Sequence, residues 1–235
     1  MILQDPQQSL NPVYTIGNQL AEAFRVHDSS ATADEVRRRS ITALENVHVP
    51  APERRLRSYP HEISGGMKQR VVGAMAMAYQ PQVLIADEPT TALDVTIQAQ
   101  YLRLLKELQE RTRVSILLIT HDFGVVAEAC DHVAVMYAGR IIEQAPVEAI
   151  FDRPRHPYTK ALLASRLRLD FLPDRLPSIE GQPPALHDLP EGCRFAPRCP
   201  YAQDRCRDSY PDEVAYGDRH IAACWRAGEA LWPSH

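Results

Sequence analysis

The stretch Val83-Leu-Ile-Ala-Asp-Glu88 decides the fold, because it is a short apolar run that ends in two adjacent carboxylates. An apolar run of this length suits a buried parallel strand. Two acidic groups at its end are costly to bury unless the strand tip opens into a polar site. There, one carboxylate can hold Mg²⁺ through water while the other polarises an attacking water. A buried strand with a merely polar end is the alternative for this stretch taken alone.

A second strand with a polar tip follows one helix later. Residues 96–110 place apolar side chains on one helical face, and Ser115–Thr120 is a second apolar run that we expect to form a buried strand. His121 comes directly after that run. Because the carboxyl ends of parallel strands meet at one edge of a sheet, we expect His121 to lie near Asp87 and Glu88.

The rest of the chain predicts further alternation of helices and strands. Helices are expected at residues 16–26, 32–47, 64–79 and 123–129, and a pair of strands within 132–144 that turns at Ala138-Gly139. Thr32 stands three residues before Glu35, which is a capping-box pattern. The fold class is therefore α/β, with a mostly parallel sheet and helices on its faces.

Ser64-Gly65-Gly66 stands at the predicted start of a helix. Free backbone N–H groups and the helix dipole attract phosphate there, and glycine lets the backbone come close to an anion. A simple helix cap explains the same three residues equally well. These three residues favour a phosphate site only when they are taken together with the two polar strand tips.

Composition describes an ordinary globular protein of 235 residues, 45% apolar and 24% charged, with a net charge of −4. The charge gives no electrostatic reason to expect nucleic acid as a partner. No apolar run approaches the roughly 18–20 residues that span a bilayer. The start, Met1-Ile-Leu-Gln-Asp-Pro, lacks the basic region followed by an apolar stretch that is typical of a secretory signal. We therefore predict a cytoplasmic protein that reaches a membrane only through a partner.

Five motifs in one order resemble the ATPase subunits of ABC transporters of the oligopeptide/dipeptide (peptide/nickel) importer type. Leu3-Gln4-Asp-Pro resembles the Q-loop, 63–70 the signature motif and 84–88 the Walker B strand. Thr91-Ala-Leu-Asp94 resembles the D-loop, and His121 the switch histidine. The resemblance implies a P-loop NTPase-like nucleotide-binding domain that binds ATP and Mg²⁺ and hydrolyses ATP to drive peptide transport.

The resemblance also implies a role for each matched residue. Glu88 would be the general base or water-polarising carboxylate, Asp87 would support Mg²⁺, and His121 would contact the γ-phosphate. Gln4 would touch the metal or water and sense the membrane subunit. The signature residues Ser64, Gly65 and Gly66 would contact nucleotide held by the opposite subunit. Asp94 would link the two sites across the dimer interface.

A phosphate-binding loop needs the pattern G-x-x-x-x-G-K-[ST], and the 235 residues do not contain one. In the family that loop lies upstream of the Q-loop, where this sequence begins. One interpretation is an N-terminally incomplete sequence whose Met1 is internal. The other is a short, non-catalytic chain that only lends Ser64–Gly66 and Asp94 to a partner ATPase.

Prolines recur from Pro146 onward and predict a loop-rich extension after the α/β core. We expect an ATPase domain at 1–150, with a helical subdomain at about 16–80, and an extension at 151–235. Residues 156–164 predict a helix with Pro157 at its first position, and they resemble the segment typical of peptide and nickel importers.

Four of the five cysteines cluster in the extension, at Cys193, Cys199, Cys206 and Cys224. Four thiolates suit an iron–sulfur cluster or structural zinc, although the paired C-x2-C of zinc ribbons is missing. The family resemblance favours a [4Fe–4S] cluster, and four reduced cysteines without metal are the alternative. Cys130 is expected to be a buried apolar residue, and His156, His187 and His220 to be surface residues.

The expected partners are a second ABC ATPase subunit, identical or not, the transmembrane permease subunits and, indirectly, an extracytoplasmic peptide-binding protein. The protein would then be peripheral on the inner face of the membrane. A chromosome-maintenance or DNA-repair ATPase is a rival, but its long heptad repeats are missing between Gln4 and Ser64. A metal- or iron–sulfur-binding module built on the cysteines is a third interpretation.

Overall fold

A computed structural model describes residues 1–5, 9–91, 93–165, 178–217 and 219–229. The chain divides into two compact units, 1–129 and 130–235. The sequence placed a boundary near residue 150 instead. The strands at 132–146 share a core with the C-terminal segment, which is why the structure groups them with it.

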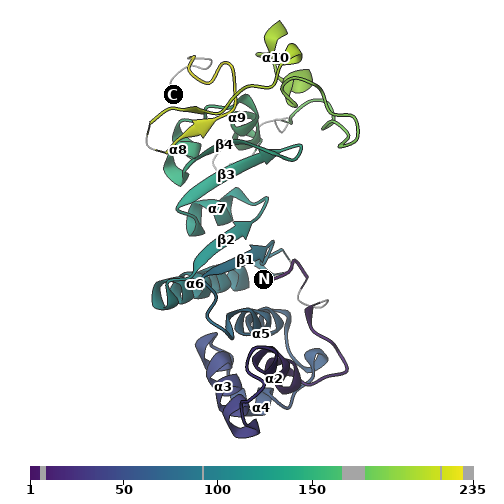
Figure 1. Cartoon of the computed structure of the whole chain (residues 1–235), viewed down its shortest axis with the longest axis vertical. Helices are drawn as coiled ribbons and strands as arrows, with labels where there is room; N and C mark the ends of the chain where they lie inside the picture. The colour runs from purple at the N-terminus through teal and green to yellow at the C-terminus, as the bar shows by residue number, and fades with distance from the viewer. Residues whose placement is uncertain (6–8, 92, 166–177, 218, 230–235) are drawn as a thin grey trace. The chain divides into compact units, whose positions relative to one another are not determined.

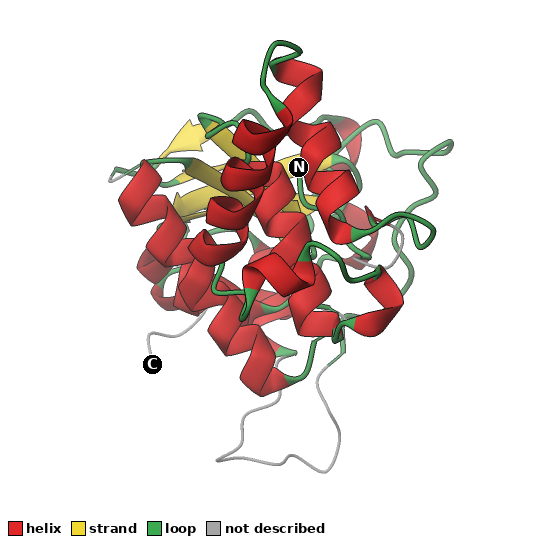
Figure 2. Cartoon of the chain, turned by 90° about the horizontal axis from the view of Figure 1, so that it is seen from below, coloured by secondary structure: helices red, strands yellow, loops and turns green. Residues whose placement is uncertain are grey.

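Helices dominate the first unit (Figure 1). They are α2 (Ile16–His27), α3 (Ala33–Asn46), α4 (Pro52–Arg55), η1 (Pro60–Glu62), α5 (Gly65–Met77), α6 (Val95–Thr112) and α7 (Phe123–Ala129). Among them, α2, α3 and α5 pack on one another. Figure 2, which views the chain from below, draws these helices in red. The predicted helices are confirmed to within two residues at each end.

The helix starts follow from their capping side chains. Thr32 Oγ1 accepts the backbone N–H of Glu35 at 3.3 Å, and Ser64 Oγ accepts that of Met67 at 3.4 Å. The predicted capping box at Thr32 is only half formed. Glu35 turns its carboxylate to Arg38 and Arg39 on its own helix instead of back to the Thr32 backbone.

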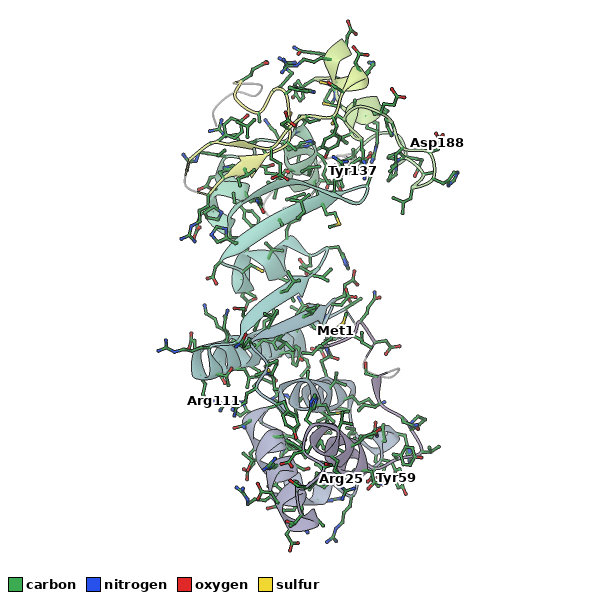
Figure 3. The ribbon with its side chains drawn as sticks, in the orientation of Figure 1. Met1, Arg25, Tyr59, Arg111, Tyr137 and Asp188 are labelled. Atoms are coloured by element: carbon green, nitrogen blue, oxygen red, sulfur yellow. The ribbon has the colours of Figure 1, made fainter. Side chains whose placement is uncertain are left out.

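The strands of the first unit are β1 (Val83–Asp87) and β2 (Ser115–Ile119), which pair in parallel with Val83 opposite Ser115. Ile2 forms a parallel bridge to Ala86 on the other side of β1. Figure 3 labels Met1 beside this strand. The chain start therefore lies next to the strand that carries Asp87, and the predicted parallel pairing is confirmed.

Only one face of the β1–β2 pair is covered. Leu84 and Ala86 are buried in the core of the first unit, together with Tyr101 of α6. On the opposite face Leu117 is 55% exposed and Ile119 is 45% exposed. The prediction of a fully buried second strand is therefore wrong, because an apolar run does not reveal whether both of its faces have a partner.

The second unit is built on an antiparallel sheet. The predicted pair of strands within 132–144 forms its hairpin, and the further strands of this sheet correct the expectation of a mostly parallel sheet. Its order is β3 (His132–Tyr137), β4 (Arg140–Pro146), β6 (Ile221–Ala222), β5 (Val214–Ala215). The predicted turn at Ala138-Gly139 is confirmed, with φ of +46° and +82°. Short helices complete the unit: α8 (Val147–Asp152), α9 (Pro157–Ala164), η2 (Ala196–Arg198) and α10 (Asp204–Asp208).

Aromatic rings and one buried carboxylate hold the second unit together. Tyr137, labelled in Figure 3, packs edge-on against Phe195 with ring centroids 5.3 Å apart. Glu143 of β4 is buried and accepts the backbone N–H groups of Arg155 (2.6 Å) and His156 (2.9 Å). It also bonds His220 Nε2 at 2.7 Å. Glu143 thereby ties two separate segments, 155–156 and the one around His220, to β4.

Candidate functional site

The centre of the site is Glu88, the residue that follows β1. Its backbone N–H donates to Ile119 O at 2.8 Å, which continues the β1–β2 ladder by one residue. Its φ is +43°, in the left-handed region that non-glycine residues seldom adopt. The carboxylate therefore leaves the strand at a sharp, strained turn, and its side chain is 24% exposed.

Three side chains converge on the Glu88 carboxylate. Gln4 Nε2 donates to Oε2 at 2.8 Å, Thr91 Oγ1 donates to the same oxygen at 3.0 Å, and His121 Nδ1 lies 3.1 Å from Oε1. These hydrogen bonds lower the pKa of Glu88, with the Thr91 bond as the largest cause and the His121 bond next. The group keeps the carboxylate ionised.

Each partner comes from a different element. Gln4 follows the Ile2 bridge to β1, so that bridge delivers the amide to the strand tip. His121 lies between β2 and α7, where Asp122 Oδ1 accepts the backbone N–H of Gly124 at 2.7 Å and caps the helix. The His121 side chain is 73% exposed. The predicted closeness of His121 and Glu88 at one edge of the sheet therefore occurs, and Gln4 joins them there.

Asp87 is half-buried at the end of β1, and its backbone N–H donates to Ile2 O at 2.9 Å. It lies next in sequence to Glu88 but takes no hydrogen bond from Gln4 or His121 among the described residues. The possible metal ligands at this strand tip are the carboxylates of Asp87 and Glu88 and the exposed side-chain amide of Gln4. Oxygen donors of this kind are those that Mg²⁺ prefers, so the residues fit the expected ion.

The signature residues lie at the start of α5. Ser64 and Gly65 are exposed, and a Cβ added to Gly65 would meet nothing within 4 Å. A Cβ on Gly66 would lie 2.8 Å from Ile97 Cγ2, so α6 approaches the backbone there. No hydrogen bond among the described residues joins these three to Glu88. An open helix N-terminus of this kind attracts an anion.

Asp94 is the N-cap of α6, and its Oδ1 accepts the backbone N–H of Ile97 at 3.0 Å. Its expected role across a dimer interface stays a prediction. Ala92 of the D-loop resemblance lies outside the described residues. Thr91 was missed by the sequence analysis, although a hydroxyl three residues after a carboxylate, in a turn, was a signal that could have found it.

The four clustered cysteines line one cavity of about 20 Å³ in the second unit. Burial raises the pKa of Cys193 and Cys199, and that of Cys224 to about 12, so the thiols are held neutral. Within the described ranges, no group of three or more His, Cys, Asp or Glu side chains is arranged to hold a metal. The donor chemistry suits iron or zinc, and the cysteines share a cavity without forming a ligand set.

Two histidines contradict the sequence analysis. His156 is 1% exposed and lines the cysteine cavity, and His220 is 5% exposed against Glu143. The prediction of surface positions is wrong for both, because the cysteines beside His156 and the carboxylate beside His220 are distant in sequence. His187 is exposed, as predicted, and Cys130 is half-buried.

None of the helices in the described part of the chain combines the length and the apolar character of a transmembrane span.

Two family models match the sequence. Residues 1–91 match the ABC transporter family, and residues 142–206 match the C-terminal region of oligopeptide/dipeptide transporters. The second match begins within β4, close to Glu143, and includes three of the four clustered cysteines.

Solved structures with the same fold include cbiO1 of Clostridium perfringens, described as part of the ABC transporter complex cbiONQ. It has a TM-score of 0.56 and 32% identity, and the alignment covers 64% of this chain and 57% of that one. The ATP-binding cassette MJ0796, solved as a dimer bound to ADP and Pi, has a TM-score of 0.53, 26% identity and 62% coverage of each chain. The chain therefore spans less than two thirds of either solved protein.

Curated relatives are similar over nearly the whole chain. A probable peptide ABC transporter ATP-binding protein of Sinorhizobium fredii is 51% identical over 98% of this chain and 69% of its own length. The dipeptide transport ATP-binding protein DppD of Escherichia coli is 52% identical over 95% of this chain and 68% of its own. The DppD protein of Bacillus subtilis is 51% identical, over 96% and 67%. The chain belongs to the ATP-binding proteins of peptide ABC transporters.

Proposed function

We propose that the chain provides the ATP-hydrolysing site that energises import of di- or oligopeptides by an ABC transporter. The observation that supports this most directly is the convergence of Gln4, Thr91 and His121 on the ionised Glu88 carboxylate. A carboxylate held charged and partly exposed can accept a proton from, or polarise, a water that attacks a phosphate.

Each side chain has a distinct task in this proposal. Asp87 and the Gln4 amide oxygen would hold Mg²⁺, which would supply positive charge against the phosphate oxygens. Glu88 orients the water, and His121, exposed beside it, is placed to donate a hydrogen bond to a terminal phosphate. Gln4 links the strand tip to the start of the chain and can report its state to a permease subunit.

Ser64, Gly65 and Gly66 would serve nucleotide on a second ATPase subunit, identical or not, and Asp94 would connect the two sites. Their place at an open helix N-terminus supports that role. Contact with permease subunits would hold the protein at the inner face of the cell membrane. An extracytoplasmic peptide-binding protein would then choose the peptide.

The test uses the protein as its own cell makes it, purified together with its permease and partner ATPase. Glu88→Gln should lower ATP hydrolysis by about 100-fold or more, the usual effect of removing a general base. Glu110→Gln, at an exposed position of α6, is the matched control and should leave the rate unchanged. Equal rates in both variants would refute the assignment of Glu88.

Substrate class needs a separate measurement. Cells that lack the gene should lose uptake of a labelled dipeptide or oligopeptide and regain it with the intact gene. Loss of Ni²⁺ uptake with unchanged peptide uptake would assign the transporter to the metal branch instead.

We also propose that the cysteine cavity takes up an iron–sulfur cluster or zinc. Four thiols of Cys193, Cys199, Cys206 and Cys224 on one cavity support this. The test is anaerobic loading of the purified protein, in one sample with ferrous iron and sulfide and in another with zinc. Absorbance near 400 nm that bleaches on reduction would identify the cluster, and neither metal retained after desalting would refute the site.

A further inference from the structure

The C-terminal end of α3 has backbone carbonyls that the helix does not satisfy by itself. His48 adopts a φ of +55°, as is common for the residue just past a helix. Its backbone N–H donates to Glu45 O at 2.9 Å, and that of Val49 donates to Leu44 O at 3.0 Å. These two bonds satisfy carbonyls of the last turn. The carbonyls of residues 46–48 come after them and need donors from elsewhere.

Two arginines from other helices donate to these carbonyls. Arg70 of α5 donates through Nη1 to Val47 O at 2.9 Å and to His48 O at 3.4 Å. Arg111 of α6 donates through Nη2 to Asn46 O at 3.2 Å. Because α3 has no basic residue in its own last turn, the positive charge that meets the negative end of its dipole comes from these two helices.

Arg70 lies close to the start of α5, which carries the signature residues. It comes six positions after Ser64, roughly 9 Å further along the helix axis. The same part of α5 also approaches α6, where a Cβ on Gly66 would lie 2.8 Å from Ile97 Cγ2. In Figure 1, α5 lies against both α3 and α6. The first turns of α5 are therefore held at two contacts, one with α6 and one with the end of α3.

We infer that Arg70 is a positioning residue for the signature residues Ser64–Gly66. Its guanidinium bonds two neighbouring carbonyls, so a rotation or a slide of α5 would break both hydrogen bonds. The place where Ser64 and Gly65 meet nucleotide on a second subunit is thereby fixed through the end of α3. This inference rests on the role proposed above for the signature residues in ATP hydrolysis.

The test uses the transporter purified from its own cell with its permease and partner ATPase. Arg70→Met keeps an unbranched apolar side chain and removes the donors. We expect the KM for ATP to rise about 10-fold and kcat to stay within about twofold, because misplaced groups that bind phosphate before and during the reaction weaken binding. Ser64→Ala removes a phosphate contact itself and should raise KM as well.

Arg111→Met is the matched control, because it removes a bond to the same end of α3. Arg111 comes seventeen positions after Asp94, the N-cap of α6, and so lies roughly 25 Å along the axis from the start of its helix. Both methionine variants should lower the temperature at which the transporter loses activity. Arg111→Met should keep the KM of the wild-type protein. Equal rises in KM for both variants would attribute the effect to a damaged end of α3 and overturn the inference.

Ser64→Ala distinguishes failure of the inference from failure of the proposed function. If KM rises in Ser64→Ala but not in Arg70→Met, the inference is overturned and the role of the signature residues stands. If KM is unchanged in both, the role of the signature residues fails and the inference fails with it.

Arg70→Lys covers the case in which the methionine variant does not assemble. Lysine keeps the charge but is a single, shorter point charge, so we expect a rise in KM of about threefold. A wild-type KM in Arg70→Lys would then overturn the inference.

Discussion

Thr91 Oγ1 donates a hydrogen bond to Glu88 Oε2 at 3.0 Å, and this bond is the largest cause of the low pKa of that carboxyl. Both residues belong to the tight turn after β1, in which Thr91 N lies 3.3 Å from Glu88 O. The turn thus carries its own hydroxyl to the carboxylate. Glu88 keeps this partner whether or not Gln4 and His121 move away.

Replacing Thr91 by valine keeps the shape of the side chain and removes the donor. We expect the pKa of Glu88 to rise toward its ordinary value of 4.5. A carboxyl whose pKa is lowered by folding stabilises the folded protein at pH values above its unfolded-state pKa. This stabilisation is lost as the pH falls through the folded-state pKa. In Thr91→Val this stabilising contribution should therefore be smaller, and its loss on acidification should be complete at a higher pH.

The measurement is a titration of the Glu88 carboxyl carbon by NMR. Thr96→Val, at an exposed position of α6, is the control and should leave the curve unchanged. An unchanged Glu88 curve in Thr91→Val would mean that His121 or Gln4 sets the pKa.

The two signature glycines should respond oppositely to alanine. Gly65→Ala adds a methyl group to open space and should stabilise the protein by up to about 1 kcal/mol, through helix propensity. Gly66→Ala brings a Cβ to 2.8 Å from Ile97 Cγ2, a methyl on a stiff β-branched side chain, and should cost about 1–3 kcal/mol. Denaturant unfolding measures both changes.

Ile97→Ala in the Gly66→Ala background removes the clashing methyl and should recover part of the loss. If the double variant is no more stable than expected from adding the two single changes, the close approach of α6 is not the cause.

Glu143→Leu removes the acceptor of the Arg155 and His156 backbone N–H groups and the partner of His220. We expect a loss of about 3–5 kcal/mol in the free energy of unfolding of the second unit, typical of breaking a buried charged network. Glu148→Gln, at an exposed position of α8, should change stability by no more than about 0.5 kcal/mol. If Glu143→Leu and the wild-type protein have nearly equal free energies of unfolding, His220 and the two backbone groups find other partners.

Asp94 allows its capping role to be separated from the proposed role across a dimer. Asp94→Ser keeps an N-cap oxygen and should unfold as wild type does, whereas Asp94→Ala should cost about 1 kcal/mol. ATP hydrolysis by the assembled transporter should fall in both variants if Asp94 links the two sites. If hydrolysis falls only in Asp94→Ala, in step with its lower stability, Asp94 acts only as a helix cap.

The sequence predicted best what depends on local pattern. The apolar run before Asp87 and Glu88 gave β1, and the bounds of α7 were predicted without error. The closeness of His121 and Glu88 followed from the polarity of a parallel sheet. These inferences needed only neighbouring residues and one general rule of topology.

Contacts between distant residues could not be predicted in this way. Glu143 and His220 are 77 positions apart, and neither lies in a pattern that points to the other. The backbone N–H of His156 bonds the same carboxylate. The exposed face of β2 could not be predicted for another reason. An apolar run shows that a strand can be buried but not which partner covers it.

That exposed side also decides how the protein must be handled. Val83 is 57% exposed, and with Leu117 and Ile119 it adds apolar surface to the open face of β1 and β2. Apolar surface in water favours self-association that grows with concentration and with kosmotropic salt. Light scattering should therefore rise steeply on ammonium sulfate addition, and a Leu117→Lys protein should stay clear at concentrations where the native sequence turns turbid.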